Sequence, residues 1–179
     1  MTSDEQGQLR LRIRELLEAN HALTLATLSA SNDDNDGLSP WAADLFFASD
    51  PALSLYFISS PDSQHSLDLV DNGQVAVTVR GDSPGWFSIR GLQISGRAAA
   101  ITESQRPAVL ALYLDKFVAL KAIYQQPANA DEEKIRQRLI GSRFYCIQPH
   151  WIRLIDNSRG FAAKQELTLT SHSPQKNNR

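Results

Sequence analysis

The sequence predicts a mainly β domain of the α+β class, an antiparallel barrel with helices outside it. Apolar and other residues alternate in short runs such as 53–58, as in half-buried strands. Turn-forming residues separate five such runs. Gly91 and Gly96 interrupt the last run, where missing side chains permit the coiling that a closed barrel needs.

The elements of the first half follow from these patterns. Strands are expected at residues 22–28, 39–48, 53–58, 74–80 and 86–101. A helix should precede them, with Ser3 and Gln6 as a capping box and Asn20 as its end. Residues 29–37 are expected as a loop. Its acids do not complete the EF-hand order, so a solvated loop is the simpler interpretation: Asp33, Asp34 and Asp36.

The second half changes character. An apolar stripe at helical spacing starts near Ser104 and reaches Tyr124, and a charged helix is expected over 131–140, ended by Gly141. Residues 143–155 return to a strand pattern that Pro149 interrupts. We expect one domain over residues 1–170 and a disordered polar tail over residues 171–179.

Composition narrows the classes of protein. The 179 residues, 42% of them hydrophobic, suffice for one buried core, and the formal net charge of -2 argues against a nucleic-acid surface. The polar start and the lack of a long apolar run argue against a signal peptide or membrane span. The single cysteine, Cys146, excludes an internal disulfide. A cytoplasmic protein is expected.

Polar side chains gather where the third strand passes into a short helix: Ser59, Ser60, Ser63, Gln64 and His65. The first turn of a helix has unpaired N–H donors and the positive end of the helix dipole, so hydroxyls beside it favour an anion. The same residues are also ordinary loop formers, with Ser63 capping the helix. Asp71-Asn72-Gly73 is expected to close this helix, with Gly73 free to take a positive φ.

Several common sites are absent from the sequence. There is no G-x-G-x-x-G after a strand and no G-x-x-x-x-G-K-[ST], so neither usual nucleotide cradle is supported. The four histidines stand far apart, without paired-ligand spacing, and a metal site is not expected: His21, His65, His150 and His172. Cys146 lies among apolar residues and is expected to be an inert packing residue.

Residues 22–101 resemble the pyridoxamine 5'-phosphate oxidase-like, flavin-binding split barrels. The resemblance rests on element order and short motifs: Phe57-Ile58-Ser59, then Ser63-Gln64-His65, Leu67 and Leu69, and later Arg90 and Gly96. Residues 156–164, DNSRGFAAK, are similar to a small uncharacterised bacterial branch of that group. The resemblance implies a six- to seven-stranded antiparallel split β-barrel with peripheral helices, forming a homodimer with FMN at the dimer interface.

Further site residues come from the resemblance alone. It implies that the backbone near Trp41 and Ala42 forms a wall for the flavin ring, although Trp41 also suits a barrel plug or a dimer contact. Arg90 matches a cationic position near the flavin, with a surface ion pair as the alternative. Lys164, with Arg159, would reach across the dimer towards the cofactor.

One departure from the family bears on FMN. Where the oxidases place Arg and Lys on the phosphate, this chain has Gln64 and His65. A protonated His65 would supply a positive charge to the phosphate, so the affinity for FMN is expected to decline as pH rises through the titration of this histidine. The alternative is an exposed histidine without this role.

The functional prediction is an FMN-binding protein, with a flavin-dependent oxidoreductase of unknown substrate as the preferred activity. A non-catalytic flavin- or haem-binding dimer of the same fold is the alternative, and a structural dimer with an empty cleft is the third. No catalytic side chain stands out.

Overall fold

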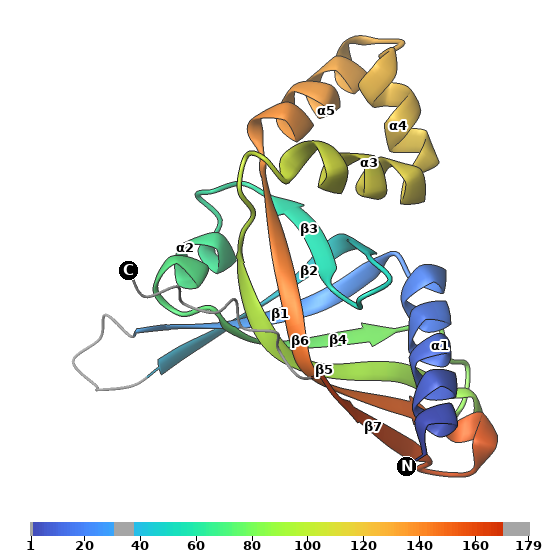
Figure 1. Cartoon of the computed structure of the whole chain (residues 1–179). Coiled ribbons are helices and arrows are strands. Elements are labelled where there is room, and N and C mark those ends of the chain that lie inside the picture. The colour runs from blue at the N-terminus through green and yellow to red at the C-terminus, as the bar shows by residue number, and fades with distance from the viewer. Residues whose placement is uncertain (1, 31–37, 170–179) are drawn as a thin grey trace, which may run out of the picture.

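A curved antiparallel sheet organises the chain in the computed structural model, which describes residues 2–30 and 38–169 (Figure 1). Seven strands of these residues lie in the order β3-β2-β1-β4-β5-β6-β7, and β3 also pairs with β6. Six strands therefore close into a ring, with β7 added outside it. The bounds are β1 (Ala22–Ala30), β2 (Leu38–Ser49), β3 (Leu55–Ser59), β4 (Gln74–Arg80), β5 (Arg90–Ala100), β6 (Arg143–Asp156) and β7 (Lys164–Thr168). This confirms the predicted split-barrel-like α+β fold.

The strands bury one face because their sequences alternate. In β4, Val75, Val77 and Val79 point into the barrel, and the residues between them are exposed. Phe57 and Tyr145, opposite each other on β3 and β6, stack inside it with centroids 5.0 Å apart. These side chains belong to one apolar cluster that fills the barrel.

Glycines permit two close approaches in the sheet. A Cβ on Gly96 would lie 2.6 Å from the carbonyl oxygen of Gln148, and the register of β5 against β6 shifts beside it, leaving His150 as an extra residue. The end of α2 at Asp71, with Asn72 as its C-cap, agrees with the prediction. Gly73 does not take the positive φ that was open to it, since Gly160 is the glycine with positive φ among the described residues. Gly73 instead lies where a Cβ would meet the carbonyl oxygen of Ala98 at 2.9 Å.

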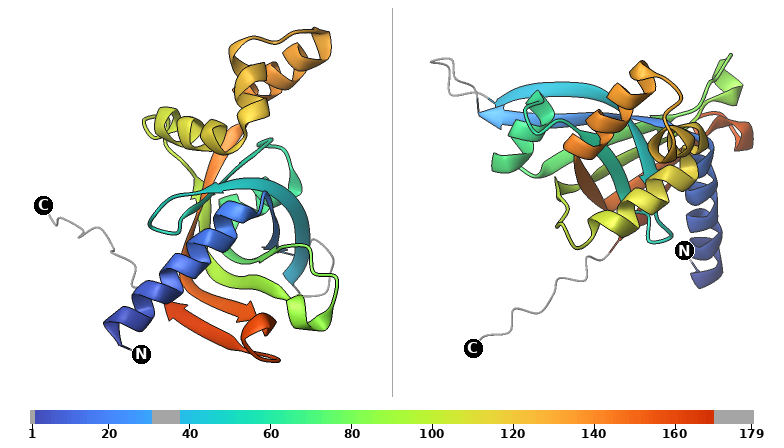
Figure 2. Two further views of the ribbon diagram at one scale, coloured as in Figure 1. Left: turned by 90° about the vertical axis from the view of Figure 1, so that its right-hand side faces the viewer. Right: turned by 90° about the horizontal axis from the view of Figure 1, so that it is seen from above.

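Five α-helices of the described residues cover the barrel or extend from it: α1 (Ser3–Ala19), α2 (Gln64–Asp71), α3 (Arg106–Lys116), α4 (Val118–Gln125) and α5 (Ala130–Gly141). The α1 helix packs Leu9, Ile13 and Leu17 on the core. The views in Figure 2 show α4 and α5 projecting beyond the barrel, and α3 lying between them and the strands.

Several boundaries differ from the prediction. The capping box of α1 joins Thr2 and Glu5, not Ser3 and Gln6. The single helix expected from Ser104 is two helices, broken at Phe117. Residues 86–88 form a 3-10 turn, η1 (Trp86–Ser88), before β5 rather than its first part.

The segment 143–168 also differs. Pro149 does not interrupt β6, because it sits at the register shift rather than at a break. After β6 comes a second 3-10 turn, η2 (Asn157–Arg159), and then β7, which was not predicted. The expected loop over residues 29–37 begins later than predicted, since Ser29 and Ala30 belong to β1. The rest of that range, with its three acids, and the tail 171–179 lie outside the described residues.

Candidate functional site

Two of the three serines predicted to converge do lie together with the histidine, where β3 ends and α2 begins. The Ser59 hydroxyl lies 2.7 Å from Nε2 of His65, and the Ser63 hydroxyl lies 3.0 Å from the same nitrogen. The two hydroxyls are 3.0 Å apart. We call Ser59, Ser63 and His65 the hydroxyl cluster.

Neighbouring groups fix this cluster. The Ser63 hydroxyl donates to the backbone carbonyl of Ser60 at 2.9 Å and lies 2.8 Å from the Ser66 hydroxyl. Because a hydroxyl has a single proton, these contacts require Ser63 to accept from some of its neighbours. The Ser60 hydroxyl accepts from the backbone N–H of Asp62 at 3.4 Å and does not join the cluster.

The start of α2 presents free donors beside the cluster. Ser63 is the N-cap, as expected, but its side chain makes no capping hydrogen bond to the helix. The backbone N–H groups of Gln64, His65 and Ser66 have no acceptor among the described residues. The first turn of α2 therefore offers three free N–H donors at residues next to the two hydroxyls, an arrangement that suits an oxyanion.

His65 is buried, with 7% of its surface exposed, so the alternative of an exposed histidine is wrong. Its ring meets Phe57 edge to face with centroids 6.1 Å apart. Burial lowers the pKa of His65, and the carboxylate of Asp68 partly opposes this effect. Without a ligand the ring is therefore neutral over a wider pH range than a free histidine, which works against the expected cationic role.

Gln64 turns away from the cluster towards a buried acid. Its side-chain amide donates to Asp68 at 2.7 Å, and the Thr27 hydroxyl of β1 donates to the other oxygen of Asp68 at 2.5 Å. Asp68 and Thr27 are both almost fully buried. The Thr27–Asp68 bond ties α2 to the sheet, and it could not be predicted from the sequence because its partners are 41 residues apart.

Trp41 and Ala42 lie close to this end of the barrel. Trp41 of β2 is opposite Thr27 of β1, the residue that bonds Asp68 of α2. About half of the Trp41 surface is exposed. The β3 strand pairs with β2 over Phe47–Ser49 alone, so within the described residues the outer edge of β2 at Trp41 and Ala42 has no strand beside it. Backbone groups there are available to a ligand.

Arg90 and Lys164 lie elsewhere in the same protomer. Ser59 is opposite the first residue of β6, whereas Arg90 is opposite its last residue and Lys164 opposite the residue before that. Because β6 has 14 residues, its ends are roughly 40 Å apart along the strand. Arg90 makes the alternative ion pair, with its Nε 3.5 Å from Asp156. A role for Arg90, Lys164 or Arg159 beside the cluster therefore requires a second copy of the chain.

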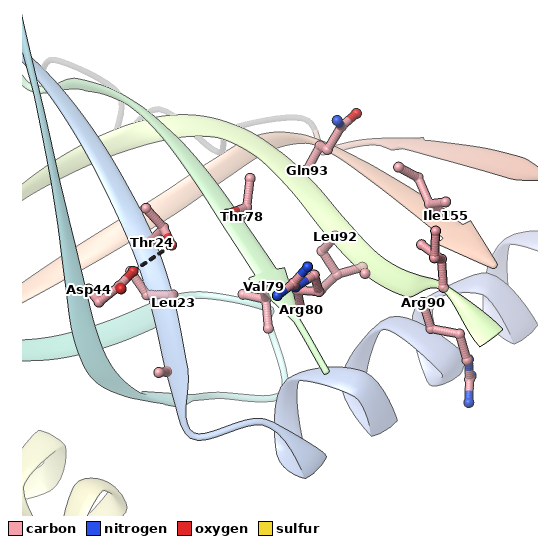
Figure 3. A pocket seen from close by; sticks show the side chains of 13 residues that line it. Leu23, Thr24, Asp44, Thr78, Val79, Arg80, Arg90, Leu92, Gln93 and Ile155 are labelled. Atoms are coloured by element: carbon pink, nitrogen blue, oxygen red, sulfur yellow. Dashed lines mark hydrogen bonds between the residues drawn. The ribbon is translucent and has the colours of Figure 1, made fainter. Parts of the chain in front are cut away.

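Two grooves lie on the outer face of the sheet. One of about 580 Å³ runs over β1, β4 and β5; Figure 3 shows Arg80 and Arg90 beside it and the Thr24 hydroxyl bonded to Asp44 at 2.6 Å. The other, of about 500 Å³, is lined mainly by small and apolar residues, with Arg97 and His150 at its margin. Neither groove contains the hydroxyl cluster.

The described residues contain neither a metal cluster nor a reactive thiol. No three His, Cys, Asp or Glu side chains gather there as a metal site needs. Burial raises the pKa of Cys146 to about 11, which makes this thiol a poor nucleophile. Across residues 2–30 and 38–169, every helix is too short or too polar to traverse a lipid bilayer.

Comparison with solved structures supports the fold. A conserved hypothetical protein from Mycobacterium tuberculosis is 16% identical with a TM-score of 0.63, over 98% of this chain and 94% of that one. HutZ, the haem storage protein from Vibrio cholerae, is 19% identical with a TM-score of 0.57, over 78% and 88%. An FAD-binding protein from Mesorhizobium loti is 20% identical with a TM-score of 0.53, over 79% and 90%.

Sequence comparison gives the family. Among curated protein sequences, none matches this chain. The sequence profile described as pyridoxamine 5'-phosphate oxidase matches residues 9–156, which include the whole ring of strands, the hydroxyl cluster and α2. The chain therefore belongs to the pyridoxamine 5'-phosphate oxidase-like family of split barrels, whose members include flavin-binding and haem-binding proteins.

Proposed function

We propose that this protein binds FMN, with the phosphate at the start of α2. The observation that carries the proposal is a set of three N–H groups, of Gln64, His65 and Ser66, that have no acceptor within residues 2–30 and 38–169. They lie next in sequence to the hydroxyls of Ser59 and Ser63. A phosphate has enough acceptor oxygens to bind several of these donors at once, and the helix dipole favours its charge.

The flavin ring would lie along the outer edge of β2. The edge beside Trp41 and Ala42 has unpaired backbone groups within the described residues. Such groups can bond the polar edge of a flavin, and the exposed Trp41 ring offers a flat apolar surface. Trp41 is opposite Thr27, which contacts α2, so this position is compatible with a phosphate at the helix start.

A homodimer is part of the proposal. Three exposed aromatic rings lie at two neighbouring turns, Trp86 and Phe87 in η1 and Phe161 just after η2. The rings of Phe87 and Phe161 meet edge to face with centroids 6.4 Å apart. The buried Asn157 holds these turns by donating to the carbonyl of Trp86 at 2.6 Å. Exposed apolar patches commonly mark protein interfaces. A second copy bound there would cover these rings, and it is also what Arg90 and Lys164 would need in order to reach a cofactor.

The preferred activity is that of a flavin-dependent oxidoreductase of unknown substrate. FMN, when bound, supplies the exchange of a hydride or electrons. The chain would supply the phosphate site, the wall for the ring and the exclusion of water by the second copy. This division of roles needs no acid or base among the side chains of the cluster.

The test begins with gently purified protein. Absorption and mass spectrometry of any co-purifying small molecule should identify FMN, and added FMN should raise the melting temperature, because a ligand specific to the native state stabilises it. Absence of both a bound flavin and a thermal shift would remove the proposal.

The dimer has its own test. Light scattering should give the mass of a dimer, and Phe161→Ser should weaken the dimer, with Val118→Ser on α4 as the exposed control.

One observation favours haem as a second candidate. His150 is the extra residue at the β5–β6 register shift and borders the 500 Å³ apolar groove, with Arg97 also at its margin. An exposed imidazole can bind an iron, and an arginine can pair with a haem carboxylate. His65 suits this role less, because hydroxyls already occupy its Nε2. A red protein whose Soret band shifts in His150→Ala would favour haem over FMN.

A further inference from the structure

The proposed phosphate site has no permanent positive charge of its own. Residues 59–71, which span the end of β3, the loop and α2, contain three aspartates and no lysine or arginine. His65 is buried and its pKa is lowered, so it is a weak source of charge near neutral pH. A phosphate held there would need a cation from another element.

The register of β3 and β6 provides one. Arg143, the first residue of β6, is directly opposite Ser59. Two residues along the same strands, Phe57 and Tyr145 are opposite each other and their rings stack with an interplanar angle of 9°. Side chains alternate along a strand, so Ser59 and Arg143 share the face on which Phe57 and Tyr145 meet. Arg143 thus extends this row at the rim where α2 begins.

The guanidinium of Arg143 is not neutralised by the described residues. Its side chain is exposed and makes no hydrogen bond there, nor an ion pair within 4.0 Å. Arg143 lines a hollow of about 180 Å³ together with Glu103 and Arg106. Arg106 is already held by the carbonyls of Ser142 at 3.0 Å and Ile140 at 2.9 Å, and it lies over the Phe144 ring.

We propose that Arg143 supplies the fixed positive charge for the phosphate of FMN and so makes the site select FMN over riboflavin. The proposal rests on the proposed function. An arginine binds a phosphate through two parallel N–H groups and stays charged at every physiological pH. A charge at this position would make up for the lack of a lysine or arginine in residues 59–71.

The experiment compares FMN with riboflavin, which lacks the phosphate, by quenching of flavin fluorescence. Arg143→Gln should weaken FMN binding about 10-fold or more and leave riboflavin within about 2-fold. Arg143→Lys should retain part of the FMN affinity, since a point charge remains. Arg138→Gln, an exposed arginine of α5, is the control for net charge and should bind both flavins as the wild type does.

The outcomes separate the two proposals. Equal FMN affinity in Arg143→Gln and the wild type would overturn the role of Arg143 and leave FMN binding intact. If the wild type bound FMN no better than riboflavin, or bound neither, the phosphate site itself would be wrong. Circular dichroism confirms that each variant is folded. Should Arg143→Gln fail to fold, a wild-type FMN affinity that does not fall with added salt would count against Arg143, because a charged contact is screened.

Discussion

Ser59 and His65 are six residues apart in the chain, yet their side chains meet at 2.7 Å inside the rim of the barrel. The turn between β3 and α2 makes this contact possible, because only residues 60–63 separate the end of the strand from the start of the helix (Figure 1). The imidazole is thereby buried against Phe57 with its Nε2 shared by two hydroxyls. The cluster is therefore assembled by the local geometry of the strand-to-helix turn.

His65 should make the ligand-free protein less stable in acid. Burial lowers its pKa in the folded state, so the unfolded chain binds the proton more readily. The contribution of this group to stability is therefore present above the unfolded value near 6.5 and is lost as pH falls through the folded pKa. Urea unfolding of the wild type and of His65→Gln at pH 7.5 and pH 5 measures this. The wild type should lose more stability than the variant, and equal losses would contradict the assignment.

The Thr27–Asp68 bond should contribute more to the free energy of unfolding than the Thr24–Asp44 bond, whose threonine lies on the same strand. Thr27→Val leaves a nearly fully buried carboxylate without one of its two partners, which should cost about 1–3 kcal/mol. Thr24→Val removes a similar bond to Asp44, but both of these residues are exposed, so water replaces the donor and the cost should stay below about 1 kcal/mol. Free energies of unfolding in urea provide the comparison, and a larger loss in Thr24→Val would reverse the interpretation.

The six strands of the ring could be predicted from the sequence, and β4 shows the reason most clearly, because it buries every second residue. The β7 strand escaped prediction: its sequence KQELT is mostly polar, and it buries Leu167 alone. The break between α3 and α4 at Phe117 also had no signal, since neither proline nor glycine marks it. There tertiary packing overrides local preference, with the Phe117 ring between those of Tyr113 and Phe46.

The site was predictable to the extent that it is local. Ser59, Ser63 and His65 lie within seven residues, so the strand-to-helix transition sufficed to bring them together. Thr27 and Arg143 come from strands far away in the sequence, and their positions depend on which strands pair. No spacing rule in a single sequence specifies that pairing, which is why both residues were missed.

Gly96 should not tolerate a methyl group. Its absent Cβ would lie 2.6 Å from a backbone oxygen at the β5–β6 register shift, so Gly96→Ala must displace one strand and should cost about 1–3 kcal/mol. Gly7→Ala is the matched control, because nothing lies within 4 Å of that position in α1. It should stabilise the protein by about 0.5–1 kcal/mol, since alanine favours the helix. Thermal and urea unfolding of both variants check the opposite signs, and destabilisation of both would show that space at the Cβ is not the deciding factor.

Lys116 should couple α3 to the end of α1. Its ammonium donates to the carbonyls of Leu17 at 2.9 Å and Asn20 at 2.6 Å, and it lies 3.9 Å above the Phe47 ring. The first two contacts satisfy carbonyls that the end of a helix leaves unpaired, where a cation is also favoured by the dipole. Lys116→Met keeps most of the aliphatic packing and removes the donors, and it should cost about 1–3 kcal/mol.

Lys121→Met is the control for this change. Lys121 has an exposed ion pair with Asp115 at 2.7 Å, and such pairs contribute less than about 1 kcal/mol. Hydrogen exchange adds a local readout: in Lys116→Met the amides in the last turn of α1 should lose protection before those of the barrel strands, because the contact that holds this turn to α3 is gone. Unchanged exchange in α1 together with an unchanged urea midpoint would show that the helix end is held by its core residues alone.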